Sequence, residues 1–231
     1  YEILFFWVAR MILMTGYIIG DIPFKNVYLH GTVRDQQGRK MSKSLGNGID
    51  PIDVSKKYGA DAARISLIIG AGPGTDTRVY EDKIKGYKHF ANKIWNVTRF
   101  VLSACQNIKE EPTEYTDANK KILDELDELV SKTTKNLDNY KIHIAAEDIY
   151  QYFWHVFADK IIEDSKKILY EENGEANKNE TMWVLRKILE TSMKILHPFM
   201  PHITEEVHSI INEHFDKKDF HLIMVDRWPK M

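Results

Sequence analysis

A short polar segment near the start of the chain carries residue types that bind phosphate groups. Residues 38–47 read Gly-Arg-Lys-Met-Ser-Lys-Ser-Leu-Gly-Asn, so that cations and hydroxyls follow one another between glycines. Lys40 and Lys43 can place point charges on phosphate oxygens, and the hydroxyls of Ser42 and Ser44 can add donors. The segment therefore predicts a loop that closes over a polyphosphate.

The chemistry that such a loop supports is electrostatic. When a carboxylate attacks the α-phosphate of a nucleotide, charge builds on the equatorial oxygens and on the departing pyrophosphate. Lysines that meet this charge only in the transition state lower the barrier. The alternative is an ordinary solvated basic loop, which is the usual meaning of a lysine-rich stretch.

The elements around this loop are predicted from apolar patterns and turn residues. The expected elements are a buried helix over residues 3–18, a buried strand over 26–30, a hairpin or exposed loop over 32–44, and short helices over 50–58 and 60–69. Asp50 and Pro51 mark the first short helix, because an aspartate can cap the N-terminus and proline fits the first turn.

From about residue 80 the pattern changes to apolar residues spaced three and four apart, which is typical of long amphipathic helices. We expect long helices over 84–102, 122–137, 142–161 and 184–196 and a last helix over 204–214, with polar loops at 109–117 and 171–180 and a β-prone tail at 220–228. Trp95, Trp154, Trp183 and the methionines are expected in the core. These lengths suit a helical bundle.

Composition restricts the class of protein. The 231 residues include 32 basic and 34 acidic ones, so a nucleic-acid partner would have to be met by a local basic patch. The single cysteine, Cys105, excludes an internal disulfide and a thiolate zinc cluster, and favours the cytoplasm. The apolar run from Ile3 to Ile19 is interrupted by Arg10 and lacks a basic lead, so we expect neither a signal peptide nor a membrane span.

Residues 40–44 match the Lys-Met-Ser-Lys-Ser signature of class I aminoacyl-tRNA synthetases without a mismatch, and the chain resembles this family along nearly its whole length. The other matching segments are residues 1–11, His30-Gly31, 58–64, 92–101, 197–206 and Trp228-Pro229. Within the family, residues 1–11 are similar to the valyl enzymes. Isoleucyl enzymes usually place Asp-Gln followed by Gly-Trp-Phe there, and this chain lacks that pattern. Leucyl enzymes typically read Ser-Lys-Gly-Asn at the end of the signature, where this chain reads Ser-Leu-Gly-Asn.

The resemblance implies a mainly α chain in three parts. These are the C-terminal remnant of a Rossmann-like α/β catalytic domain over 1–48, a stem-contact segment over 49–80, and an α-helical bundle that binds the anticodon over 81–231. The full-length protein is then expected to activate valine with ATP and Mg²⁺ and to transfer it to tRNA(Val). We also expect a monomer, and no tightly bound metal in this part.

The resemblance also assigns roles to residues. Lys40 and Lys43 are the expected catalytic cations, and the expected ATP-binding residues are Glu2, His30, Gly31, Met41, Ser42 and Ser44. Glu2 stands where valyl enzymes usually carry aspartate. Asn92, Lys93 and Arg99 are expected to contact tRNA, although by residue type alone they also fit an exposed helix face, and His30 also fits a core histidine.

The chain departs from the family pattern in one respect that bears on activity. It begins with Tyr1 and does not contain the His-Ile-Gly-His signature, so we expect a fragment that does not activate valine by itself. Three alternatives stay open: a fragment of an isoleucyl enzyme, a noncatalytic tRNA-binding module, and a structural helical protein whose loop match is accidental.

Overall fold

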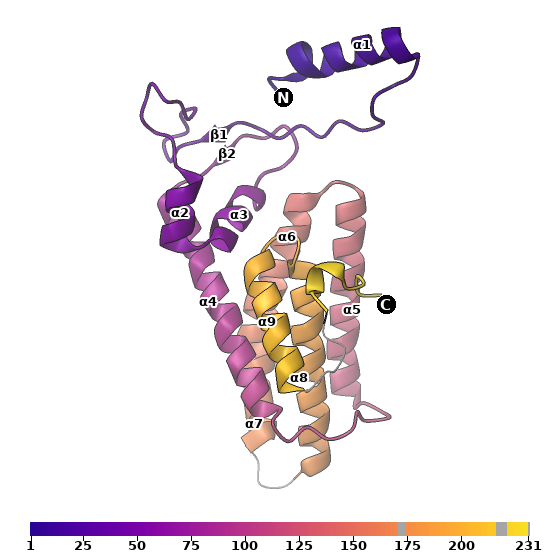
Figure 1. Cartoon of the computed structure of the whole chain (residues 1–231). Helices are drawn as coiled ribbons and strands as arrows, with labels where there is room; N and C mark the ends of the chain where they lie inside the picture. The colour runs from indigo at the N-terminus through magenta and orange to yellow at the C-terminus, as the bar shows by residue number, and fades with distance from the viewer. Residues whose placement is uncertain (171–173, 216–220, 231) are drawn as a thin grey trace.

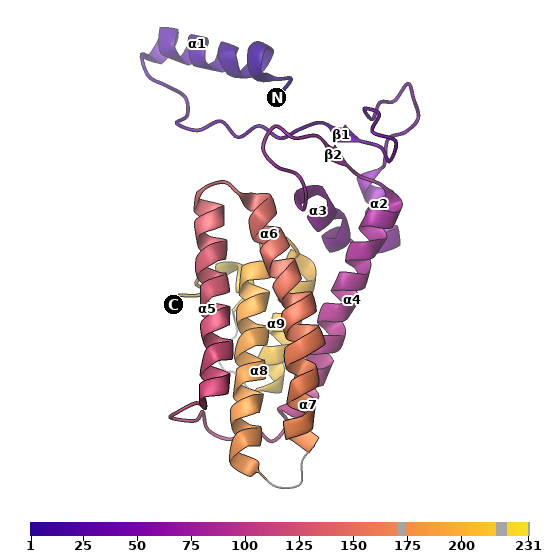
Figure 2. The same cartoon turned by 180° about the vertical axis from the view of Figure 1, so that it is seen from behind.

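The computed structural model describes residues 1–170, 174–215 and 221–230 of the chain. A bundle of long helices forms the larger part, and a smaller, less regular part lies on one end of it (Figure 1). The reverse view shows the same separation of helix α1 (Ala9–Ile19) from the bundle (Figure 2). The expected mainly α fold is confirmed.

The bundle is built from α4 (Glu81–Ala104), α5 (Asp117–Asp138), α6 (Ile142–Gln151), α7 (Ile162–Tyr170), α8 (Glu175–Leu196) and α9 (Pro201–His214). A π-helical stretch, Tyr152–Ile161, joins α6 to α7. α5 begins where the hydroxyl of Thr116 accepts a hydrogen bond from the backbone N–H of Asn119 at 3.4 Å. The long helices predicted from apolar spacing are therefore present.

The apolar faces of these helices meet in one core. Its largest fully buried side chains include Phe90, Phe153, Phe157 and Phe199. Removing each such side chain from water stabilises the fold by about 1.5–3 kcal/mol. The rings of Phe90 and Phe153 meet edge to face with centroids 5.9 Å apart, so the π-helical stretch is held against the middle of α4.

Two short helices, α2 (Pro51–Tyr58) and α3 (Ala60–Ile68), connect the smaller part to the bundle. Asp50 caps α2 as expected, because its Oδ1 accepts a hydrogen bond from the N–H of Ile52 at 2.7 Å. The buried carboxylate of Asp61 accepts from the N–H groups of His202 and Ile203, at 3.2 and 2.7 Å. An acidic group is favourable at the start of a helix, so Asp61 fastens α3 to α9.

A small parallel sheet ties the ends of the less regular part together. Strand β1 (Val33–Arg34) pairs with β2 (Thr77–Arg78), with Val33 opposite Thr77. The expected strand at 26–30 is wrong, because those residues form no strand. The contact of this stretch with the segment before β2 is a hydrogen bond from the N–H of Gly74 to the carbonyl of Leu29 at 2.8 Å.

The expectation of a buried N-terminal helix is half wrong. A π-helical turn, Leu4–Val8, leads into α1, but Phe5 is 81% and Tyr17 90% exposed. Among the described residues only that turn contacts α1 closely. Apolar spacing determines the helix, whereas burial requires a second surface.

Three further expectations are corrected. The expected loop at 171–180 is wrong for residues 175–180, which belong to α8, and residues 171–173 lie outside the described residues. The carboxylate of Glu180 in this helix is buried and accepts from Thr116 N–H at 2.6 Å. The last helix starts at Pro201, three residues before the expected Thr204. The tail has a 3₁₀ turn, Ile223–Val225, in place of the expected strand, and residues 216–220 lie outside the described residues.

Two expectations about the core also need comment. Trp95 is 38% exposed, so its expected place in the core is wrong, while Trp154 packs against the core and Trp183 is half-buried. The expectation for the methionines holds for the buried Met193 and Met200 and for the half-buried Met41 and Met182, which pack against buried apolar clusters. It fails for the exposed Met11, Met14 and Met224, and Met231 lies outside the described residues. In the part of the chain that the structure describes, no helix combines the length and apolar character needed to cross a membrane.

Candidate functional site

The lysine-rich loop starts with a tight reversal of the chain after β1. The N–H of Asp35 bonds to the carbonyl of Arg39, and the N–H of Gly38 to the carbonyl of Asp35, both at 2.9 Å. Gly38 has a φ of 83°, which glycine adopts without a steric penalty. The expected hairpin is therefore present, and it returns Lys40 beside Arg34.

The buried carboxylate of Asp35 holds this loop from inside. It accepts hydrogen bonds from the N–H of Arg39 at 2.8 Å, from Arg39 Nε at 2.8 Å and from Asn47 Nδ2 at 2.9 Å. The Oδ1 of Asn47 accepts in turn from the N–H of Ser42 at 2.9 Å. Asp35 and Asn47 therefore clamp both ends of the segment that carries the lysines.

The hydrogen bond from Asn47 is the largest cause that lowers the pKa of Asp35 from 3.8 to about 2, although burial acts in the opposite direction. Because the unfolded chain then takes up the proton first, this stabilisation is complete above about pH 4 and is lost as the pH falls towards about 2. We expect Asp35→Asn to flatten the loss of stability in this range. Urea unfolding at pH values from about 5 to about 2 would measure it, and a variant as pH-sensitive as the wild type would contradict it.

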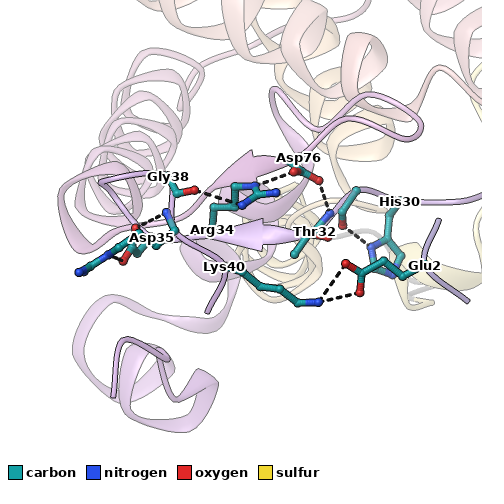
Figure 3. Close-up of polar contacts among 10 residues, drawn as sticks. Glu2, His30, Thr32, Arg34, Asp35, Gly38, Lys40 and Asp76 are labelled. Atoms are coloured by element: carbon teal, nitrogen blue, oxygen red, sulfur yellow. Dashed lines mark hydrogen bonds and ion pairs between the residues drawn. The ribbon is translucent and has the colours of Figure 1, made fainter. Parts of the chain in front are cut away.

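The side chain of Lys40 points to the first residues of the chain (Figure 3). Its Nζ lies 2.7 and 2.9 Å from the carboxylate oxygens of Glu2. The hydrogen bond from Lys40 lowers the pKa of Glu2, which keeps this carboxyl charged. Both side chains are more than half exposed, and such pairs contribute little net stability, so an incoming anion can replace Glu2 beside Lys40.

A cavity of about 260 Å³ adjoins this ion pair and is lined by residues 1–3 and 28–33, which include Glu2, His30 and Gly31. His30 Nδ1 lies 2.7 Å from the carbonyl oxygen of Gly31. A carbonyl only accepts, so Nδ1 is the donor in this contact. The structure thus brings together Glu2, His30, Gly31 and Lys40 from the predicted set.

The start of β1 is positioned by Asp76. Its carboxylate accepts from the N–H of Thr32 at 2.7 Å and from Arg34 Nε at 2.6 Å (Figure 3). Gly31 precedes this contact, and a Cβ added there would lie 2.0 Å from the carbonyl oxygen of Thr75. Only a glycine allows the two backbones to approach so closely.

The other predicted residues of the loop differ in burial: Met41 packs against the protein, whereas Lys43 is exposed. Met41 is half-buried and packs on the small apolar cluster that includes Val54 and Ile84. The hydroxyl oxygens of Ser42 and Ser44 lie 3.1 Å apart. Lys43 is exposed and forms no ion pair with any described residue, so its charge is available to a ligand.

The three residues predicted to contact tRNA lie on α4 and differ in availability. Asn92 and Arg99 are exposed and lie two helical turns apart on one face. Lys93 is half-buried, and its Nζ lies 2.7 Å from Asp159 and 5.8 Å from the ring centre of Trp154. The exposed Trp95 lies on the face of Asn92 and Arg99, which therefore combines an aromatic ring, an amide and a cation.

Four residues of these arrangements were missed from the sequence: Asp35, Asn47, Asp76 and Trp95. Asn47 closes the recognised motif, so its position was a usable signal. The spacing of Trp95, three residues after Asn92 and four before Arg99, also placed it on that face. Asp76 gave no signal, because its partner Arg34 lies 42 residues earlier in the chain.

Known families match both parts of the chain. The family described as "tRNA synthetases class I (I, L, M and V)" matches residues 1–80. The family described as "Anticodon-binding domain of tRNA ligase" matches residues 119–231.

Curated relatives are similar along the chain. A "Valine--tRNA ligase" of Clostridium tetani is 44% identical over 234 residues, which cover 100% of this chain and 26% of the relative. One of Thermotoga maritima is 49% identical over 208 residues, 90% of this chain and 24% of the relative. The chain thus spans about a quarter of the length of these relatives.

Solved structures share the fold. The ternary complex of Agrobacterium radiobacter K84 agnB2 LeuRS, tRNA and LeuAMS superposes with a TM-score of 0.70 at 24% identity, over 95% of this chain and 26% of that chain. Mycobacterium tuberculosis methionyl-tRNA synthetase with methionyl-adenylate superposes with a TM-score of 0.74 at 22% identity. The superposition covers 94% of this chain and 44% of that chain. Both likenesses concern the fold alone.

Proposed function

This chain belongs to the class I tRNA synthetases, and from that premise we propose that it is part of a valine–tRNA ligase. In the full-length protein it supplies the phosphate loop of the ATP site and the anticodon-binding bundle. The observation that carries the ATP site is Lys40, which lies beside the cavity at His30 on a loop clamped by Asp35. The identity of the relatives supports valine as the amino acid.

In the proposed reaction the amino-acid carboxylate attacks the α-phosphate of ATP and pyrophosphate leaves. Lys40 exchanges its partner Glu2 for phosphate oxygens, and Lys43 adds a second charge from the exposed end of the loop. Ser42 and Ser44 donate hydroxyl hydrogen bonds to the same oxygens. These contacts are strongest when charge has built up on the phosphates, so they stabilise the transition state more than bound ATP.

The cavity beside the loop is proposed to hold the nucleoside half of ATP. Glu2 stands at its edge, where a carboxylate can accept from ribose hydroxyls once Lys40 has turned to the phosphates. His30 and Gly31 line the cavity and would contact the base. Met41 contributes by anchoring the loop.

Mg²⁺ is proposed to arrive with ATP as part of the substrate. Magnesium in such sites is commonly held by substrate phosphates with few protein carboxylates. Among the residues that the structure describes, no group of three or more histidine, cysteine or acidic side chains could hold a metal ion. Glu2 is the carboxylate nearest to Lys40 in the contacts of this site, and it is assigned to ribose.

The proposed domain limits are 1–48 for the catalytic part, 49–80 for the stem-contact segment and 81–231 for the anticodon-binding part. The start of α4 at Glu81 supports the second limit. The protein is proposed to be a cytoplasmic monomer, and the single, buried Cys105 supports the reducing compartment.

The exposed face of α4 is the proposed contact for tRNA. Unpaired bases can stack on the ring of Trp95, and Asn92 can hydrogen-bond to base edges. Arg99 is the cation for a phosphate. Lys93 is proposed as a weaker contact, because Asp159 already compensates its charge.

We expect Arg99→Ala to weaken tRNA binding by the full-length protein about fivefold at 0.1 M salt, since one phosphate contact is lost. The slope of log K against log salt should also fall by about 1. Filter binding over a salt series measures both. Lys121→Ala on α5, which removes an exposed lysine without an ion pair to any described residue, is the matched control. Equal losses for the two variants would contradict the assignment.

Charging assays test the proposed activity directly. The full-length protein should attach valine to tRNA in preference to isoleucine, and ATP–pyrophosphate exchange should depend on valine. The isolated residues 1–231 should show no exchange. A preference for isoleucine would favour the isoleucyl alternative, and tRNA binding without exchange by the full-length protein would favour a noncatalytic module. Failure to bind ATP or tRNA would leave a structural helical protein.

A further inference from the structure

The turn between α5 and α6 has a backbone conformation that its residue does not favour. At the end of α5 the N–H of Tyr140 bonds to the carbonyl of Leu137 at 3.0 Å, and the N–H of Lys141 to the carbonyl of Asn136 at 2.8 Å. In this type of helix cap the left-handed position is usually glycine. Here it is Tyr140, with a φ of 57°, and among the described residues it is the one non-glycine with a positive φ.

Burial of the ring does not explain the tyrosine. Tyr140 is 48% exposed. Its hydroxyl accepts a hydrogen bond from Asn26 Nδ2 at 3.1 Å, and its ring centre lies 6.3 Å from that of Tyr28. Glycine or asparagine would adopt this backbone with less strain. A strained residue whose half-exposed ring is held beside Asn26 and Tyr28 points to a role in binding.

Tyr28 and Tyr140 line a cavity of about 460 Å³ between residues 26–28 and the α5–α6 turn. This volume lies within the range of about 300–1,000 Å³ that is usual for ligand sites. His143 and Asn26 also line it, so polar groups stand beside the two rings.

The charges around this cavity favour an anionic ligand. Lys141 lines it, is exposed and forms no ion pair with a described residue. None of the lining residues is acidic.

We propose that this cavity binds an unpaired nucleobase of tRNA. The base stacks on the rings of Tyr28 and Tyr140, its polar edge meets Asn26, and its phosphate meets Lys141. Two half-exposed aromatic rings beside an amide and a cation are the usual means of holding an unpaired base. A peptide would use the apolar lining, but it would match the ring faces and Lys141 only where it carried an aromatic and an acidic residue at this spacing.

This inference rests on the proposed binding of tRNA and adds a contact remote from the end of α4. The α5–α6 turn lies at the end of the bundle next to β1 and β2, whereas α4 ends at the opposite end (Figures 1 and 2). The two contacts would therefore engage different parts of one tRNA.

Tyr140→Gly in the full-length protein is the sharpest test, because glycine suits the backbone and removes only the side chain. We expect the Kd for tRNA to rise about tenfold, the usual effect of losing one stacked base. The Tm should change by less than about 4 °C, since strain relief offsets the lost ring contacts. Tyr140→Phe, which keeps the ring, is the matched control and should bind within about threefold of wild type. Ultraviolet cross-linking of the wild-type complex should attach RNA to residues 26–28 or 139–144.

The outcomes separate this inference from the proposed function. A wild-type protein that does not bind tRNA overturns both. A wild-type protein that binds, with Tyr140→Gly within twofold of it and no cross-link at these residues, overturns the cavity alone. If Tyr140→Gly bound tRNA as tightly as the wild type but charged it more slowly, the cavity proposal would also be overturned. The Asn26–Tyr140 contact would then be assigned to coupling between the two parts of the chain.

Discussion

Replacing Lys40 and Lys43 together by alanine is expected to lower the rate of valine activation by the full-length protein by about 10³-fold or more. Removing one donor that stabilises transition-state charge costs about 10²–10³-fold, and here two cations are lost from one loop. The loop itself should remain folded. It is held by Asp35 and Asn47, which contact the backbone of the loop and the side chain of Arg39 but neither lysine side chain.

Valine-dependent ATP–pyrophosphate exchange measures this effect, with the Kd for ATP measured separately. Loss of activity should fall mainly on kcat, because the lysines act most strongly on the transition state. Lys56→Ala on α2 is the control, since it removes an exposed lysine outside the loop that forms no ion pair with a described residue. If the double variant exchanged pyrophosphate as fast as Lys56→Ala, the loop would have no catalytic role.

Gly31→Ala is expected to lower the free energy of unfolding by about 3 kcal/mol, the upper part of the range for overpacking. The added Cβ would lie 2.0 Å from Thr75 O and 2.5 Å from Asp76 N, and both are backbone atoms. The segment before β1 must then move away from Asp76, which breaks the contact to Thr32 at 2.7 Å. Because Lys40 returns beside β1, the ATP site should be lost as well.

Urea unfolding and thermal melting measure this change, with an expected fall in Tm of about 6–12 °C. Gly86→Ala is the matched control, because Gly86 lies within α4 and a Cβ there meets nothing within 4 Å. That change should raise stability by up to about 1 kcal/mol, since alanine favours helix. A Gly31→Ala protein as stable as wild type would show that residues 29–32 do not lie against residues 74–77 in solution.

Features set by neighbouring residues could be predicted from the sequence. The hairpin at residues 32–44 depends on Gly38 and its immediate neighbours, and the start of α2 on Asp50 and Pro51. The bundle helices followed from apolar spacing. The lysine-rich motif, which lies within ten residues, indicated the family, and the proposed phosphate loop rests on the same motif.

Features that depend on residues far apart in the chain could not be predicted. Glu180 lies in α8, where its buried carboxylate bonds to Thr116, 64 residues away, whereas the polar stretch alone indicated a loop. Trp95 was expected in the core because tryptophan is usually buried, but α4 turns that face to solvent. α1 was expected to be buried, although no described element covers it.

The amino-acid sequence by itself determined the chemistry that is available: the two lysines, the hydroxyls, and the helices that carry Asn92 and Arg99. Only the tertiary structure decided which of these groups meet. It placed Lys40 against Glu2, closed the loop with Asp35 and Asn47, and set Tyr140 beside Tyr28. The physical reason is that local propensity acts over a few residues, whereas these contacts join segments whose approach is determined by packing of the whole chain.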